Sequence, residues 1–164
     1  MVSHERGQVL ALLGIFALHN VEEIIHLPRD RAPLPVWAVR RGPWADTPSY
    51  AVATGLLTVA VSAASIAGIR AHGLRRGVLL GGPSAALLGN AASHMARALL
   101  QRHYNGGLAT APAMALLAGR VFASGTRSIG PSAHRCTFIA ANLAAVPAII
   151  GALLAGRVLT RMNA

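Results

Sequence analysis

The chain has 164 residues, 54% of them hydrophobic and 12% charged, and its mean hydropathy of +0.50 excludes an ordinary soluble domain and favours a membrane protein. The net charge of +10 comes from arginines that flank apolar stretches, without the aromatic stacking positions of a nucleic-acid surface, so no nucleic-acid partner is expected. A single cysteine, Cys136, excludes an internal disulfide and a cysteine-based zinc site.

Five apolar stretches approach the 20 or so residues that a helix needs to cross a hydrocarbon core of about 30 Å. They cover approximately residues 8–27, 50–69, 77–100, 108–123 and 137–159. Pro28 ends the first stretch, whereas Pro83, Pro112 and Pro147 fall inside others, where proline is expected to bend a helix. The sequence therefore predicts an all-α fold: one polytopic bundle of about five transmembrane helices, 1–164, in the cell membrane.

The first stretch carries the segment His19-Asn20-Val21-Glu22-Glu23-Ile24-Ile25-His26. Only five acids occur in the chain, and two of them are adjacent here. Because a carboxylate is costly inside a membrane, such residues normally mark a functional site. At about 100° per residue, His19, Glu22, Glu23 and His26 occupy one arc of a helix, so we expect them to face a common space.

The third stretch has a matching polar stripe at Asn90, His94, Arg97 and Gln101. The first and third helices of such a bundle run in the same direction, and both stripes lie in the C-terminal halves of their helices. We therefore expect the two stripes to meet at one depth in the membrane. The connections that emerge on that side carry aromatic residues suited to the interface or to substrate contact, namely Trp37, Trp44 and Tyr104.

These residues form three motifs in order along the chain. His19 to Glu23 reads HxxEE, Asn90 to His94 reads NxxxH, and Tyr104-Asn105-Gly106-Gly107 resembles a YxPG element, with Gly106 in place of Pro. Over about Gln8 to Ala111 the chain resembles the HXXEE-domain family of small membrane proteins. The resemblance implies an integral membrane protein, an enzyme, whose motif residues form its site; the family name describes a pattern and no reaction.

Metal chemistry is the first mechanism that the residues indicate. Imidazole and carboxylate ligands suit Zn, Fe or Mn, and His19 with Glu23 has the i, i+4 spacing that lets one helix supply two ligands. The predicted metal ligands are His19, Glu23, His26 and His94, and Asn90 would orient one of them through a hydrogen bond. A two-iron site would need about four carboxylates, so one metal, or two held mainly by histidines, is expected.

Acid-base chemistry without a metal is the alternative. Two adjacent carboxyl groups, Glu22 and Glu23, are expected to hold one proton between them in an apolar environment. With His94 as a partner acid or base and Arg97 as a neutralising charge, such a site suits an isomerase or cyclase of a lipid or an apolar natural product.

A protein that conducts ions or protons, or an accessory subunit, would also carry such residues within the membrane. The second, fourth and fifth stretches are nearly bare of ionisable groups, which favours a one-sided pocket over a transport path. The sequence predicts an enzyme whose hydrophobic or amphipathic substrate enters from membrane lipid, and it leaves a homo-oligomer open.

Overall fold

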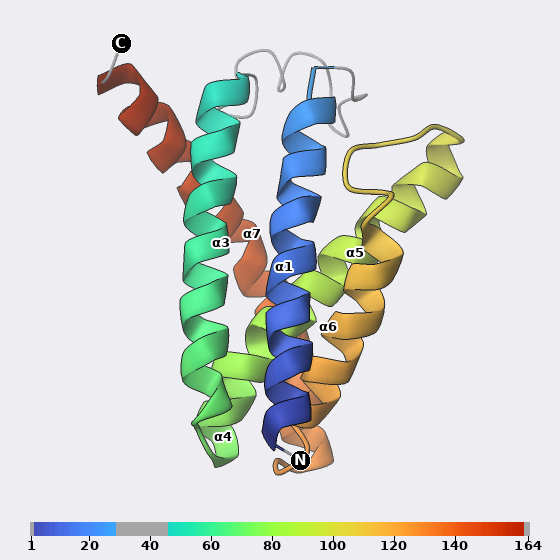
Figure 1. The fold of residues 1–164 in the computed structure, drawn as a ribbon, viewed down its shortest axis with the longest axis vertical. Helices are drawn as coiled ribbons and strands as arrows, with labels where there is room; N and C mark the ends of the chain where they lie inside the picture. Colours follow the sequence, from blue (N-terminus) through green and yellow to red (C-terminus); the bar gives the residue numbers. More distant parts are fainter. Residues whose placement is uncertain (1, 29–45, 163–164) are drawn as a thin grey trace.

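The computed structural model describes residues 2–28 and 46–162, and within these ranges the chain is helical, without strands (Figure 1). The long helices are α1 (Val2–His26), α3 (Thr47–Ile69), α5 (Gly82–Gln101), α6 (Ala111–Gly125) and α7 (Pro131–Met162). Two short elements, α4 (Gly73–Arg76) and the π-helical η1 (Gly77–Gly81), lead into α5. The all-α prediction is confirmed.

Each of the five predicted stretches coincides with a long helix, but the helices are unequal. Among the residues that the structure describes, three segments are long and apolar enough to cross a membrane: His4–His26, Thr47–Ile69 and Pro131–Met162. Helix α6 has 15 residues, fewer than the 20 or so that a span needs. Helix α5 has 20 residues, and its apolar character is interrupted by the polar stripe that contains Asn90, His94 and Arg97.

Of the three prolines expected to bend helices, Pro147 lies inside α7 and Pro83 lies inside the uninterrupted helical run formed by α4, η1 and α5. Pro112 lies in the first turn of α6, where the missing N–H of proline has no helical partner to lose. The wide turn of η1 precedes Pro83, and its last bond runs from the N–H of Gly82 to the carbonyl oxygen of Gly77. The π-helical hydrogen bonds of η1 thus end next to Pro83, and the α-helical hydrogen bonds of α5 follow.

The apolar core lies where α1, η1, α5 and α6 meet, and α7 packs mainly against α3 and α5. Its buried members include Val9, Leu12 and Phe16 of α1, Leu80 of η1 and Met114 of α6. Small residues bring other helices close: a Cβ at Gly156 of α7 would overlap the backbone of Ser49 in α3. Helix α7 is therefore held from one side, while its other side carries exposed apolar residues such as Ile139, Leu143 and Leu154.

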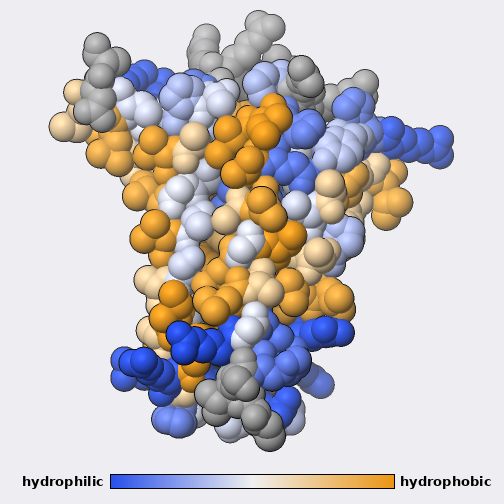
Figure 2. Space-filling view, in the orientation of Figure 1, coloured by the Kyte–Doolittle hydropathy of each residue, from blue (hydrophilic) through white to orange (hydrophobic). Residues whose placement is uncertain are grey.

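The surface is banded along the long axis. Figure 2 shows apolar side chains gathered over the middle of the visible face and hydrophilic ones at both ends. Such a band flanked by polar ends is typical of a bundle that crosses a bilayer.

Helix α3 begins at Asp46, an exposed N-cap residue. Its carboxylate accepts a hydrogen bond from the backbone N–H of Ser49 at 2.7 Å. Hydrogen bonds from the side chain and the backbone N–H of Ser49 hold the pKa of Asp46 below its usual range. Asp46 thus stabilises the start of α3 as an anion.

Candidate functional site

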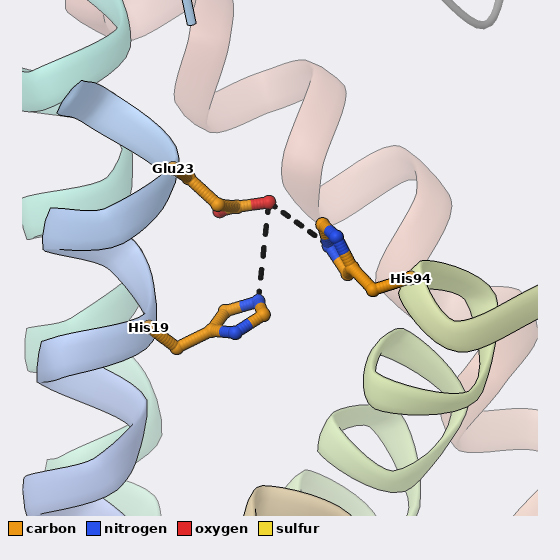
Figure 3. A group of neighbouring side chains, drawn as sticks. All are labelled: His19, Glu23 and His94. Carbon is orange, nitrogen blue, oxygen red and sulfur yellow. Dashed lines mark ion pairs between the residues drawn. The ribbon is translucent and has the colours of Figure 1, made fainter. Parts of the chain in front are cut away.

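Three side chains from two helices converge on one point. The Nε2 atom of His94, on α5, lies 3.0 Å from Oε1 of Glu23 on α1, and Nε2 of His19, one turn earlier on α1, lies 3.9 Å from the same oxygen (Figure 3). One ligand atom from each residue lies within 4.8 Å of the others. The two histidines are buried, and their rings meet edge to face at 4.7 Å between centroids. The predicted meeting of the two polar stripes is observed.

The neighbours of His19 determine which of its nitrogens carries the proton. The hydroxyl of Thr110 lies 2.8 Å from Nδ1 of His19, and its two other partners, a carboxylate oxygen of Glu22 and the carbonyl oxygen of Gly107, only accept. The hydroxyl must therefore accept from His19, so Nδ1 carries the proton. Nε2 then presents a lone pair toward Glu23, and the amide of Asn90 lies 3.1 Å from it as a donor.

His94 is oriented in the same way by Asn105. The Asn105 amide nitrogen donates to the backbone carbonyl oxygen of His94 at 3.0 Å, so its oxygen faces Nδ1 of His94 at 2.7 Å. Nδ1 therefore donates, and Nε2 of His94 is the nitrogen that faces Glu23. Two Nε2 atoms and a carboxylate oxygen thus point at one another. When His94 is neutral, its Nε2 lone pair faces the Glu23 carboxylate at 3.0 Å, and a proton or a cation between them is needed to stabilise the arrangement.

The connection between α5 and α6 holds these histidines in place. It supplies Asn105, which is 2% exposed, and Thr110. Its Gly107 has a φ of +89°, and a Cβ at this position would overlap the His19 ring. Only glycine combines this backbone conformation with such a close approach. The third motif therefore shapes the wall of the cluster.

Glu22 does not share the space of Glu23. Its carboxylate accepts hydrogen bonds from the backbone N–H groups of Ala109 at 2.9 Å and Thr110 at 3.1 Å, from the Thr110 hydroxyl at 2.8 Å, and from the hydroxyl of Tyr104. Thr110 is the N-cap residue of α6, so Glu22 places an anion at a helix N-terminus. The expectation that the two acids face one space and share a proton is corrected, because adjacent residues diverge by about 100° and the N–H groups of α6 attract Glu22.

The other predicted site residues have separate positions. Nδ1 of His26 lies 2.9 Å from the backbone carbonyl oxygen of Glu22, and the His26 ring packs against Tyr104 at 5.1 Å between centroids. The structure therefore does not bring His26 to the other three predicted metal ligands, because its ring is turned toward Glu22 and Tyr104. Tyr104 itself anchors Glu22. Trp37 and Trp44 lie outside the described residues.

A cavity of about 950 Å³ opens beside the cluster. It lies between α1 and α7, and α3 and α5 complete its walls. Glu23, Asn90, His94 and Arg97 line part of it, and most of the remaining lining is apolar. Its volume is at the upper end of the range for small-molecule sites, about 300–1,000 Å³. The expected apolar cavity beside the acidic motif is therefore present.

The sequence that carries this site matches a known protein family. Residues 10–122 match a family described as "Protein of unknown function with HXXEE motif". The chain belongs to the HXXEE family. No curated protein and no solved structure matches it. The matched region of the HXXEE family runs past Gly107, where the three motifs end, and takes in most of α6, whose N-terminus binds Glu22.

Two residues of the site were not predicted from the sequence. Asn105 lies inside the third HXXEE motif, and this position was the available signal, but a single polar residue in a loop does not reveal which histidine it orients. Thr110 precedes the start of α6 and has the residue type of an N-cap. That signal predicts a helix start and does not predict contacts with His19 and Glu22.

Proposed function

We propose that this protein is a multi-pass enzyme of the cell membrane that transforms a hydrophobic or amphipathic small molecule with the help of a divalent transition metal. His19, Glu23 and His94 would hold the metal, with Zn, Fe or Mn as the candidates that suit these ligands. The observation that carries the proposal is the orientation of both imidazoles: each donates from Nδ1 to a fixed acceptor and directs Nε2 at the same carboxylate.

The spacing of the ligand atoms supports a metal. Ligands at about 2.0–2.2 Å from a tetrahedral ion lie roughly 3.4 Å from one another. The separations of 3.0 Å and 3.9 Å from Glu23 Oε1 to the two nitrogens bracket that value. The three ligand atoms span up to 4.8 Å, so the two imidazoles would have to move closer together to hold one ion. Thr110 and Asn105 occupy the positions of the outer hydrogen-bond acceptors that commonly orient metal-bound histidines.

Three protein ligands leave a fourth position of a tetrahedral site for water or substrate, as in catalytic zinc sites. An ion there supplies Lewis acidity or lowers the pKa of a bound water. Asn90 donates to Nε2 of His19, so its amide would have to release this lone pair for His19 to hold a cation. The cavity then presents a substrate to this position from its apolar side.

The metal content of detergent-purified protein tests the proposal. We expect about one equivalent per chain, and His19→Ala or His94→Ala should remove most of it, because a site with few ligands is strongly weakened by the loss of one. His134→Ala is the matched control: His134 is a half-buried histidine bonded to Thr126 at 2.8 Å, away from the cluster. Full activity of protein stripped of metal would contradict the proposal.

Direct acid-base catalysis is the second candidate, and the 3.0 Å separation between His94 and Glu23 favours it. A proton between these two atoms also resolves the facing lone pairs, and the pair could move a proton on and off an apolar substrate, as an isomerase or cyclase requires. This candidate predicts that metal removal leaves the rate unchanged, whereas Glu23→Gln and His94→Ala each abolish it.

A further inference from the structure

The cavity beside Glu23 is elongated. Its lining on α7 runs from Ala133 to Leu153, a distance of about 30 Å at 1.5 Å per residue. This length is comparable to the thickness of a bilayer hydrocarbon core, about 30 Å. A compact substrate would occupy only part of such a space, so the shape favours an extended chain.

Most polar lining residues lie toward one end of this length, with Thr137 beside Cys136 as an exception. The C-terminal half of α5 contributes Asn90, Ser93, His94 and Arg97, close to Glu23 of α1. Toward the N-terminal end of α5 the lining becomes apolar, with Leu87, Pro83 and Val78, and it ends beside Leu74 and Cys136. This distribution suits an occupant with its polar group at the level of Glu23 and His94 and an apolar tail along the rest of the cavity.

The α7 wall is made of small side chains. Alanines 140, 141, 144, 145 and 148 line the cavity, while Ile139 and Leu143 of the same helix are 58% and 69% exposed on its outer side. A wall of methyl groups leaves space along α7 for an extended chain, and the outer side of α7 would face the lipid from which such a molecule would come.

The charges at the polar end indicate the head group. Arg97 lies in the lining beside His94, and a divalent metal bound to Glu23 would more than cancel the charge of that carboxylate. The polar end then carries a net positive charge, which favours an anion.

We infer that the substrate is a long single-chain amphiphile, acyl or isoprenoid, with an anionic head group held at the Glu23, His94 and Arg97 level and a tail that extends along α7 toward Cys136. This inference rests on the proposed function, because it makes the cavity the substrate site of the metal centre.

Binding of oleate to the purified protein, counted by native mass spectrometry, tests the inference. We expect about one oleate per chain, with oleylamine at least tenfold weaker. Ala141→Trp, inside the cavity, should reduce oleate occupancy at least tenfold, whereas Leu143→Trp, on the lipid side of the same helix, should leave it unchanged. Arg97→Gln should remove the preference for oleate over oleyl alcohol while the alcohol still binds. Equal binding to the Ala141 and Leu143 variants would overturn the inference.

Cys136, the only cysteine of the chain, reports on the tail. Oleate should slow its alkylation by N-ethylmaleimide at least fivefold, and octanoate, whose chain is too short to reach it, should not. Equal alkylation with bound oleate would contradict a tail along α7. Metal content measured on the same samples separates the two proposals: metal-bearing protein that binds no oleate contradicts the amphiphile alone, and metal-free protein that passes both oleate tests contradicts the metal alone.

Discussion

Glu22 and Glu23 are neighbours on α1, yet their carboxylates contact different parts of the molecule. Glu22 lies against the start of α6, where two backbone N–H groups and two hydroxyls donate to it. Glu23 lines the cavity and faces two imidazole nitrogens. The first carboxylate has donors that balance its charge, whereas the second faces lone pairs unless a proton or cation intervenes.

This difference suggests that the two acids of the HxxEE motif have different roles. The side of α1 that faces α6 fixes the connection that carries Asn105, Gly107 and Thr110, and these residues in turn orient the two histidines. The side that faces the cavity is left with a reactive cluster. Glu22 acts as a structural and positioning residue, and Glu23 is the candidate for direct contact with metal or substrate.

We expect the largest loss of turnover from substitution of Glu23. Glu23→Gln keeps the shape of the side chain but removes its charge, so turnover of any substrate that the wild-type protein converts should fall at least about 100-fold. The protein should still insert and purify, because the structure gives Glu23 no backbone donor among the described residues. Size-exclusion elution and thermal unfolding check the fold; a rate within a few-fold of wild type would remove Glu23 from the chemistry.

The next effect tests the orientation of His94. Asn105→Leu preserves bulk but removes the acceptor for Nδ1, and metal affinity should fall about 10–100-fold, as is typical when a partner of a metal-bound histidine is lost. Metal competition with a chelator measures it. Asn142→Leu is the matched control, since that half-buried amide donates to the Phe138 carbonyl oxygen at 2.9 Å away from the site; equal losses for both variants would show a general packing effect.

Glu22→Gln should act on stability instead. A Gln amide puts two N–H groups where the site already supplies donors, so some of these part-buried or exposed donors lose a charged acceptor and the free energy of unfolding should fall by about 1 kcal/mol. Metal content should stay near that of the wild type. Thermal unfolding in detergent measures the loss, and an unchanged midpoint would mean that the bonds from Ala109 and Thr110 contribute little.

The smallest effect concerns Asp46, an exposed anion at a helix start that can be compared with the half-buried Glu22. Asp46→Ala should cost about 0.5–1 kcal/mol at neutral pH, the low end for an N-cap. Because hydrogen bonds from Ser49 lower the pKa of Asp46, its contribution is present at neutral pH and is lost as the pH falls through that lowered pKa. The difference between wild type and variant should therefore vanish in acid; a difference independent of pH would contradict this reading.

The contact of His19 and Glu23 with His94 was predictable, because helical periodicity and shared depth follow from residue spacing alone. The division between Glu22 and Glu23 was not, since it depends on where α6 begins in space. His26 shows the same limit: it lies on the predicted arc, but one further turn along α1 its ring meets Tyr104 and not the cavity.

The helices were predictable for a similar reason. Which of them are long and apolar enough to cross a membrane was harder to predict. Apolar stretches of about 20 residues predict helices wherever they occur. Whether each crosses a bilayer depends on neighbours: α5 turns its polar stripe to α1 and the cavity, and α6 packs its short length against α1, η1 and α5.

Metal content of Glu22→Gln and Glu23→Gln, purified in parallel, tests the central claim most directly. The account predicts that the Glu23 variant loses most of its bound metal and keeps its thermal stability, whereas the Glu22 variant keeps its metal and loses stability. If both variants retain metal, or both lose it to the same extent at equal stability, the two carboxylates do not have the separate roles that their contacts indicate.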